Sequence, residues 1–185
     1  MILYIHGFNS SSGSSKAQQL LAWLKAQGRE KEFACPDLPH QPCKAVALLE
    51  GILASSPTPV CLIGSSLGGF YATVLAARHP SVKAALVNPA VHPQLLLKDA
   101  LGPNRNYYTE EAYDFTQSHL DDLASFDLSQ PGHPENLLLL VETGDAVLDY
   151  RDAVNYYRNC HEMILQGGDH GFSRFVDLLP FIDRF

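Results

Sequence analysis

The sequence has few basic residues, and it has no long apolar run. Lys and Arg number 13 against 20 Asp and Glu, which gives a formal net charge of -7. No cluster of Lys and Arg is present, so the chain lacks the basic surface that follows a phosphate backbone, and we expect no nucleic-acid partner. No apolar run is long enough to cross a bilayer, so we expect no membrane span.

Cysteine is also scarce: the chain has 4. Cys35, Cys43, Cys61 and Cys160 are irregularly spaced and form no Cys-x-x-Cys pair, so we expect reduced thiols rather than a disulfide framework. The chain opens with an apolar stretch and has neither a basic leader region nor a small-residue cleavage site. This beginning predicts a cytoplasmic protein.

What the chain does have is an alternation of short apolar runs and helical patterns over 185 residues. This length predicts a single domain, 1–185, and the alternation predicts a doubly wound, mostly parallel α/β sheet of about six strands with right-handed crossovers. We expect strands near 2–5, 31–35, 59–63, 82–87, 137–141 and 162–165. We expect helices near 16–27, 44–54, 69–79, 149–159 and 172–185.

The stretch Gly64-Ser65-Ser66-Leu67-Gly68 lies between an apolar run and an Ala-rich helical pattern. A strand, Gly-x-Ser-x-Gly and a helix in succession are typical of a nucleophile elbow. The glycines are required because the backbone turns back closely on itself there. Ser66 is therefore the candidate nucleophile, in a strained conformation at the start of a helix.

A serine hydroxyl needs a base, and a third group must orient that base. Among the 8 histidines, His170 follows the last predicted strand at the same edge of the sheet as Ser66; His40 and His92 also lie in loops and stay open on position alone. Asp145 follows the strand near 137–141 and is the candidate acid, whereas Asp149 has the pattern of a helix N-cap. The order Ser66, Asp145, His170 is typical of this architecture.

The backbone N–H groups of Phe8 and Leu67 are the candidate oxyanion hole, because one follows the first strand and the other follows the serine. The Ser- and Gly-rich stretch 10–15 could instead suggest a phosphate-binding loop. That motif requires a Lys directly after its second glycine, and Lys16 does not follow Gly13 directly. We therefore prefer the oxyanion loop.

The segment 93–134 is long and has no strand pattern. Thr109 followed by two glutamates predicts the N-cap of a helix. The segment contains many large apolar side chains: Leu95, Leu96, Leu97, Tyr107, Tyr108, Tyr113 and Phe115. They either form a helical cap over the active site, with an apolar acyl pocket, or complete the core against the sheet. We expect Asn88, Pro89, Tyr107 and Tyr108 to bind substrate.

Taken together, several blocks resemble the α/β hydrolases, and within them the small bacterial esterases of the YqiA type. The blocks are 3–11 (LYIHGFNSS), 64–72 (GSSLGGFYA), 87–91 (VNPAV), 143–145 (TGD) with 148–151 (LDYR), and 167–172 (GGDHGF). The resemblance implies an esterase or thioesterase with a Ser66, Asp145, His170 triad. It also implies a minimal α/β-hydrolase fold without the N-terminal antiparallel strands of larger members.

These observations predict a hydrolase that acts on a small-molecule acyl ester or thioester through a covalent acyl-enzyme, with no metal and no cofactor. Two alternatives stay open. An acyltransferase would use the same residues with an alcohol or amine acceptor, and a non-catalytic binding protein would keep the sheet with an unreactive Ser66. The sequence leaves the oligomeric state undetermined.

Overall fold

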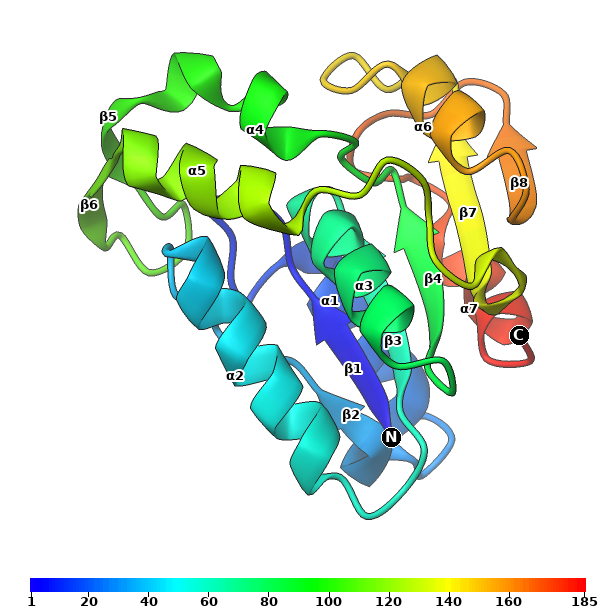
Figure 1. The fold of residues 1–185 in the computed structure, drawn as a ribbon. Helices are drawn as coiled ribbons and strands as arrows, with labels where there is room; N and C mark the ends of the chain where they lie inside the picture. Colours follow the sequence, from blue (N-terminus) through cyan, green and yellow to red (C-terminus); the bar gives the residue numbers. More distant parts are fainter.

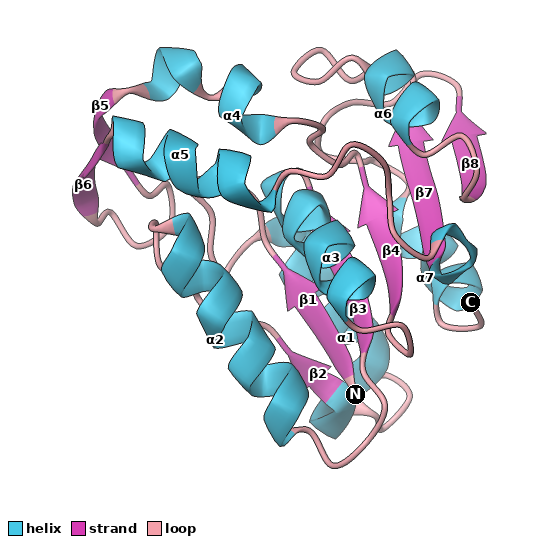
Figure 2. Ribbon diagram, in the orientation of Figure 1, coloured by secondary structure: helices cyan, strands magenta, loops and turns pink.

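The computed structural model describes residues 1–185 and contains one large sheet of 6 strands. Its strands are β1 (Ile2–Ile5), β2 (Phe33–Ala34), β3 (Cys61–Ser65), β4 (Lys83–Val87), β7 (Leu137–Glu142) and β8 (His161–Leu165). They lie in the order β2-β1-β3-β4-β7-β8, and every neighbouring pair is parallel. The predicted doubly wound parallel sheet is confirmed (Figure 2).

The central strands are apolar over most of their length because both faces of the sheet are covered. In β7, Leu137 and Leu139 belong to the core cluster on one face, and Leu138 and Leu140 belong to the cluster on the other. The same alternation is found in β1, where Leu3 and Tyr4 face opposite sides. Two separate cores therefore hold the sheet rigid from both sides.

Helices flank the sheet on both faces (Figure 1). The face toward the viewer carries α2 (Pro42–Ser55) and α3 (Leu67–Arg78), and α6 (Tyr150–Tyr156) contributes to the same core cluster. The opposite face carries α1 (Ser15–Lys25) and α7 (Phe175–Ile182). Since all six strands are parallel, their carboxyl ends meet at one edge of the sheet, where the loops after β1, β3, β4, β7 and β8 gather.

The segment 93–134 differs from the expectation, because it contains a β-hairpin. Its elements are α4 (Pro93–Leu96), a 3-10 turn (Lys98–Ala100), β5 (Gly102–Arg105), β6 (Ala112–Phe115) and α5 (Gln117–Phe126). β5 and β6 pair antiparallel and form a sheet of their own. Figure 1 shows α4 and α5 beyond the carboxyl ends of the large sheet.

Thr109 does not cap a helix, so that prediction was wrong. It lies in the connection between β5 and β6, where the Asn106 side chain accepts hydrogen bonds from the N–H groups of Tyr108 and Thr109. The helix begins later, at Gln117, with Thr116 and His119 forming a reciprocal cap. The local acidic pattern was outweighed by an asparagine-centred turn, in which Asn106 binds backbone groups before Glu110.

Other differences concern the ends of elements. The strand expected near 31–35 begins as a 3-10 turn (Glu30–Glu32) and pairs only over Phe33–Ala34. Helix α7 begins at Phe175 rather than near 172, with Pro180 inside it. A final 3-10 turn (Pro134–Asn136) leads into β7. None of the helices combines the length and the apolar character that crossing a membrane requires.

Candidate active site

Ser66 lies at the sharp turn between β3 and α3, in the conformation expected of a nucleophile elbow. Its backbone has φ 55° and ψ -121°. A positive φ is energetically costly for any residue that has a side chain. A Cβ on Gly64 would collide with the backbone of Gly68, and a Cβ on Gly68 would collide with the carbonyl of Ile5. Close packing of the turn against β1 therefore imposes both glycines and the strain on Ser66.

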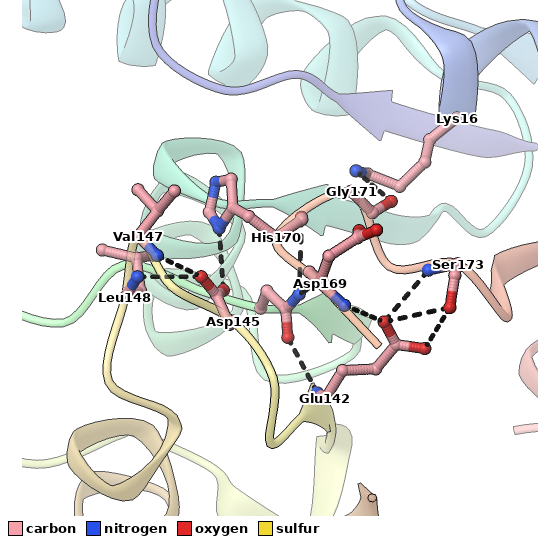
Figure 3. A network of polar contacts seen from close by, with 10 residues as sticks. Lys16, Glu142, Asp145, Val147, Leu148, Asp169, His170, Gly171 and Ser173 are labelled. Atoms are coloured by element: carbon pink, nitrogen blue, oxygen red, sulfur yellow. Dashed lines mark hydrogen bonds and ion pairs between the residues drawn. The ribbon is translucent and has the colours of Figure 1, made fainter. Parts of the chain in front are cut away.

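The imidazole of His170 is bound by the carboxylate of Asp145. His170 Nδ1 lies 2.7 Å from Asp145 Oδ2 (Figure 3), and the side chain of Asp145 is only 2% exposed. The other oxygen of Asp145 accepts hydrogen bonds from the N–H groups of Val147 and Leu148 at 2.8 and 2.9 Å. An acceptor on Nδ1 makes Nδ1 the protonated nitrogen of neutral His170 and leaves Nε2 free to accept a proton.

The loop that carries His170 is attached to the sheet by Glu142, the last residue of β7. Its fully buried carboxylate accepts hydrogen bonds from the N–H groups of Asp169 and Ser173 at 2.9 and 3.0 Å, and from the Ser173 hydroxyl (Figure 3). Burial alone raises the pKa of this carboxyl, but the hydrogen bonds from the loop outweigh burial and hold its pKa below the ordinary 4.5. Glu142 is therefore an ionised anchor beneath His170.

Asn88, after β4, is a second anchor of the same loop. Its Nδ2 donates to the carbonyl oxygens of Asp169 and His170 at 3.0 and 3.4 Å, and its Oδ1 accepts from the N–H of Glu142 at 3.0 Å. The side chain thus links two strand ends to the His170 loop.

Ser66 and His170 line one cavity of about 640 Å³ at the carboxyl edge of the sheet. No direct hydrogen bond joins the two side chains; such contacts commonly tighten when substrate binds. Phe8 and Leu67, the candidate oxyanion donors, line the same cavity. Leu67 is the first residue of α3, so its N–H has no partner within the helix.

The loop after β1 is held against Ser66 by its neighbours. A Cβ on Gly7 would lie 3.2 Å from the Cβ of Ser66, so the backbone passes close to the serine. His6 fixes this loop: its Nε2 accepts from the N–H of Leu38, and its Nδ1 donates to the carbonyl of Gly7, both at 3.0 Å. Burial lowers the pKa of His6, which keeps it neutral and suited to both roles.

The four expected substrate-binding residues divide into two pairs. Tyr107 and Tyr108 line the cavity, and both side chains are exposed. Asn88 and Pro89 do not line the cavity. Asn88 is buried as the anchor described above, and Pro89 packs tightly against Gly69 at the start of α3.

Several residues that line the cavity were not predicted from the sequence. One group is Tyr4, Ser14, Ser15 and Lys16, and a second is Pro93, Val147 and Leu148. Leu96 and Leu97, which the sequence offered for an acyl pocket, also line the cavity. The sequence holds one signal for the first group, a run of hydroxyl residues and a lysine directly after the oxyanion loop. Glu142 also carried a signal, because an acidic residue ends an otherwise apolar strand.

The other open histidines lie elsewhere. His92 Nδ1 binds Asp127, and His40 Nδ1 lies 3.0 Å from His119 Nε2. Neither His92 nor His40 lines the cavity of Ser66. No group of three or more His, Cys, Asp and Glu side chains is arranged to hold a metal ion.

Comparison with known proteins places the chain in a family. The family model described as Uncharacterised protein family (UPF0227) matches residues 1–185. The chain belongs to the UPF0227 family. UPF0227 is the YqiA family, so the resemblance noted in the sequence is confirmed.

Solved structures show the fold of this UPF0227 chain to be that of the α/β hydrolases. Alpha/beta hydrolase domain-containing protein 10 from mouse is 18% identical, with a TM-score of 0.76 over 99% of this chain and 88% of its own. Est1E from Butyrivibrio proteoclasticus, solved with ferulic acid bound, is 14% identical, with a TM-score of 0.68 over 100% of this chain and 86% of its own.

A curated relative is the biotin biosynthesis bifunctional protein BioHC of Teredinibacter turnerae. It is 30% identical over an alignment of 145 residues, and the match covers 66% of this chain. The matched region is 24% of that longer protein.

Proposed function

We propose that this protein is a serine hydrolase that cleaves carboxylic esters or acyl thioesters through a covalent acyl-enzyme on Ser66. One observation carries the proposal. A strained serine and a histidine already bound to a buried carboxylate line the same cavity. This combination provides a nucleophile, a base and a group that orients the base.

In the proposed reaction Ser66 Oγ attacks the carbonyl carbon while His170 Nε2 takes the hydroxyl proton. Asp145 stabilises the imidazolium through the hydrogen bond to Nδ1. The tetrahedral intermediate collapses, the C–O or C–S bond breaks, and His170 returns the proton to the leaving group. Water, deprotonated by His170, then attacks the acyl-enzyme and releases the acid and free Ser66.

The N–H groups of Phe8 and Leu67 are the proposed donors to the oxyanion. Their support is positional: both residues line the cavity, and the loop of Phe8 is held close to Ser66 through Gly7. Loss of one such donor typically lowers kcat by about 10² to 10³.

We also propose that the segment 93–134 is a cap within the single domain. Its outer part supports this role, because Leu96, Leu97, Tyr107 and Tyr108 line the cavity beside Ser66. Its inner part belongs to the core, since Phe115 and Leu123 are buried in the larger core cluster. The two alternatives left open by the sequence thus apply to different parts of the segment, and the apolar wall suits an acyl chain.

Similarities among known proteins agree with an ester substrate. A structural relative is described as bound to ferulic acid, and another solved relative is described as the esterase domain of a Rhodothermus marinus protein. Hydrolysis of a carboxylic ester or thioester is the activity that we propose for this chain.

The test is covalent labelling with a fluorophosphonate probe, followed by peptide mapping, in the wild type, Ser66→Ala and His170→Ala. We expect one adduct, on Ser66, that is lost in Ser66→Ala and strongly slowed in His170→Ala. His161→Ala is the matched control, because His161 is an exposed histidine on β8 outside the cavity. A folded wild type without an adduct would refute the proposal and favour a non-catalytic binding protein.

A further inference from the structure

The cavity of Ser66 has an unusual distribution of charge. It is lined by 20 residues, which include Lys16 and His170 but neither Asp nor Glu. The whole chain, in contrast, has a net charge of -7. An acidic protein that keeps carboxylates out of its candidate active-site wall, and places an ammonium group in it, suits an anionic ligand.

The lysine belongs to the start of α1, which also reaches the cavity. The first residues of this 11-residue helix, Ser15 and Lys16, line the wall. Ser14 occupies the N-cap position, but its side chain makes no capping hydrogen bond. The first N–H groups of a helix have no partner within the helix, and they carry the positive end of its dipole. This uncapped start leaves backbone donors available at the cavity.

The Ser14 hydroxyl is an independent sign of a missing partner. Ser14 is only 8% exposed and lines the cavity, yet its Oγ makes no hydrogen bond of normal length; its polar neighbour is the hydroxyl of Tyr4, which lines the same cavity. Nearly all buried hydroxyls in folded proteins are paired, so an orphaned one in a ligand cavity indicates a partner that arrives with the ligand.

The ammonium group of Lys16 has one partner and retains donors. Nζ donates to the carbonyl of Gly171 at 2.9 Å (Figure 3), and an ammonium carries three hydrogens. Burial lowers the pKa of Lys16, while the carboxylates of Asp169, Asp145 and Glu142 act in the opposite direction.

Two of these carboxylates bind other groups of the protein and do not line the cavity. Asp145 binds His170, and Glu142 binds the N–H groups of the His170 loop. Asp169 lies in the His170 loop, where its carboxylate is close to Gly171 and acts on Lys16, but it does not line the cavity wall. The wall itself presents Lys16 and no carboxylate.

We propose that Ser14, Ser15 and Lys16, here named the α1 pole, bind an anionic group of the substrate. The substrate class is then an ester or thioester that carries a carboxylate or phosphate near the scissile bond and places its hydrocarbon part against the apolar wall of Leu96, Leu97 and Leu148. The proposal rests on the proposed hydrolase function and narrows it.

The test compares matched esters that differ in one charge. For a carboxylate on the acyl side, the pair is the p-nitrophenyl monoester of adipic acid and p-nitrophenyl hexanoate. For a phosphate on the alcohol side, the pair is 1-octanoylglycerol 3-phosphate and 1-octanoylglycerol. The measured quantity is the ratio of kcat/KM for the charged and uncharged members of each pair.

We expect the wild type to prefer the charged member of at least one pair, and that pair identifies the anion. Lys16→Met should lower this ratio by about 10- to 100-fold, the usual range for a charge-assisted hydrogen bond. Ser14→Ala should lower it less, and Lys16→Arg should restore most of it. Lys25→Met is the matched control, because it removes the same charge from the exposed end of the same helix.

The ratio of kcat/KM for the charged and uncharged esters distinguishes two roles of Lys16: binding the anion of the substrate and holding the His170 loop in place. If Lys16 acts only by holding Gly171 beside His170, Lys16→Met lowers kcat/KM equally for both members, the ratio stays constant and the proposal is overturned. A wild type that prefers the uncharged member of both pairs overturns it as well. In both cases the hydrolase itself remains established.

A binding measurement covers the case in which no ester is turned over. Hexanoate should raise the melting temperature of the wild type more than hexanol does, and inorganic phosphate should do so if the anion is a phosphate. Both effects should disappear in Lys16→Met and persist in Lys25→Met. Absence of any stabilisation by either anion would refute the α1 pole independently of catalysis.

Discussion

The molecule contains two histidine–aspartate pairs with the same shortest contact distance. In each pair a histidine Nδ1 lies 2.7 Å from a carboxylate oxygen: His170 with Asp145, and His92 with Asp127. The surroundings differ. The side chain of Asp145 is 2% exposed and that of Asp127 is 19% exposed and also accepts from Gln94.

The second difference is what each histidine faces. His170 shares its cavity with the strained Ser66. His92 lines another cavity, of about 600 Å³, that contains no elbow serine. A hydrogen bond between a histidine and an aspartate is therefore not sufficient evidence of a catalytic site. The serine that receives the base, and the burial that fixes the acid, distinguish the candidate site from a surface ion pair.

The largest expected effect comes from changing each aspartate to asparagine. Asp145→Asn removes the carboxylate that orients His170 and stabilises its imidazolium, and kcat for ester hydrolysis should fall by about 10⁴-fold. Asp127→Asn should change kcat by less than about twofold, because neither Asp127 nor His92 lines the cavity of Ser66. Steady-state kinetics on a p-nitrophenyl ester measures both. Comparable losses in the two variants would show that the assignment of the acid is wrong.

The second expected effect concerns how His170, unlike His92, is anchored to the sheet. Glu142→Ala leaves the N–H groups of Asp169 and Ser173 without their buried acceptor. Unfolding should become easier by about 1–3 kcal/mol. We expect kcat to fall by about tenfold with KM little changed, because the base is displaced rather than the pocket. Glu142→Gln keeps an acceptor oxygen and should recover part of both losses.

Because Glu142 is ionised in the folded protein, we expect the stability of the protein to depend on pH. The pKa of Glu142 is lower in the folded protein than the ordinary 4.5, so ionised Glu142 favours the folded state at neutral pH. This contribution is complete above about pH 4.5 and is lost as the pH falls through the folded-state pKa. Chemical denaturation between pH 3 and 7 should show a steeper acid loss for the wild type than for Glu142→Gln. Parallel curves would contradict the anchoring role.

Much of this arrangement follows from sequence. Apolar strands covered on both faces are recognisable as uninterrupted runs, which is why β3, β4 and β7 were predicted close to their observed bounds. The elbow was predictable because steric necessity fixes Gly64 and Gly68 at either side of Ser66. Strand order then brought Asp145 and His170 to the same edge.

Other features depend on contacts distant in sequence and were not predictable. The hairpin β5–β6 packs on the loop after β1, where Tyr113 donates to Asn9 Oδ1 and Asn106 donates to the carbonyl of Ser10. Asn88 follows a strand at the carboxyl edge, as a substrate-binding residue would, but its amide is used by the His170 loop. The sequence therefore predicts that Asn88 lies at the carboxyl edge of the sheet. Whether its amide binds substrate or backbone depends on which segment packs against it in the folded protein.

A smaller effect tests the His92 pair by itself. His92 has a left-handed backbone with φ 51°, so His92→Asn is the suitable change, since asparagine tolerates that conformation. The free energy of unfolding should decrease by at most about 1 kcal/mol. Esterase activity and fluorophosphonate labelling should be unchanged. Slower labelling would mean that the second pair supports the first through α4.

A modest effect on substrate preference concerns the apolar part of the cavity that His170 lines and His92 does not. Tyr107 and Tyr108 are 77% and 50% exposed, so alanine at either position should leave the melting temperature nearly unchanged. Each ring lines the cavity, and its loss should lower kcat/KM for long acyl chains by about three- to tenfold relative to acetate esters, the value of one or two buried methylenes. Phe181→Ala, an exposed aromatic on α7 outside the cavity, is the control. A uniform loss across chain lengths would place these tyrosines in support of the oxyanion loop, because Tyr107 donates its N–H to the carbonyl of Asn9.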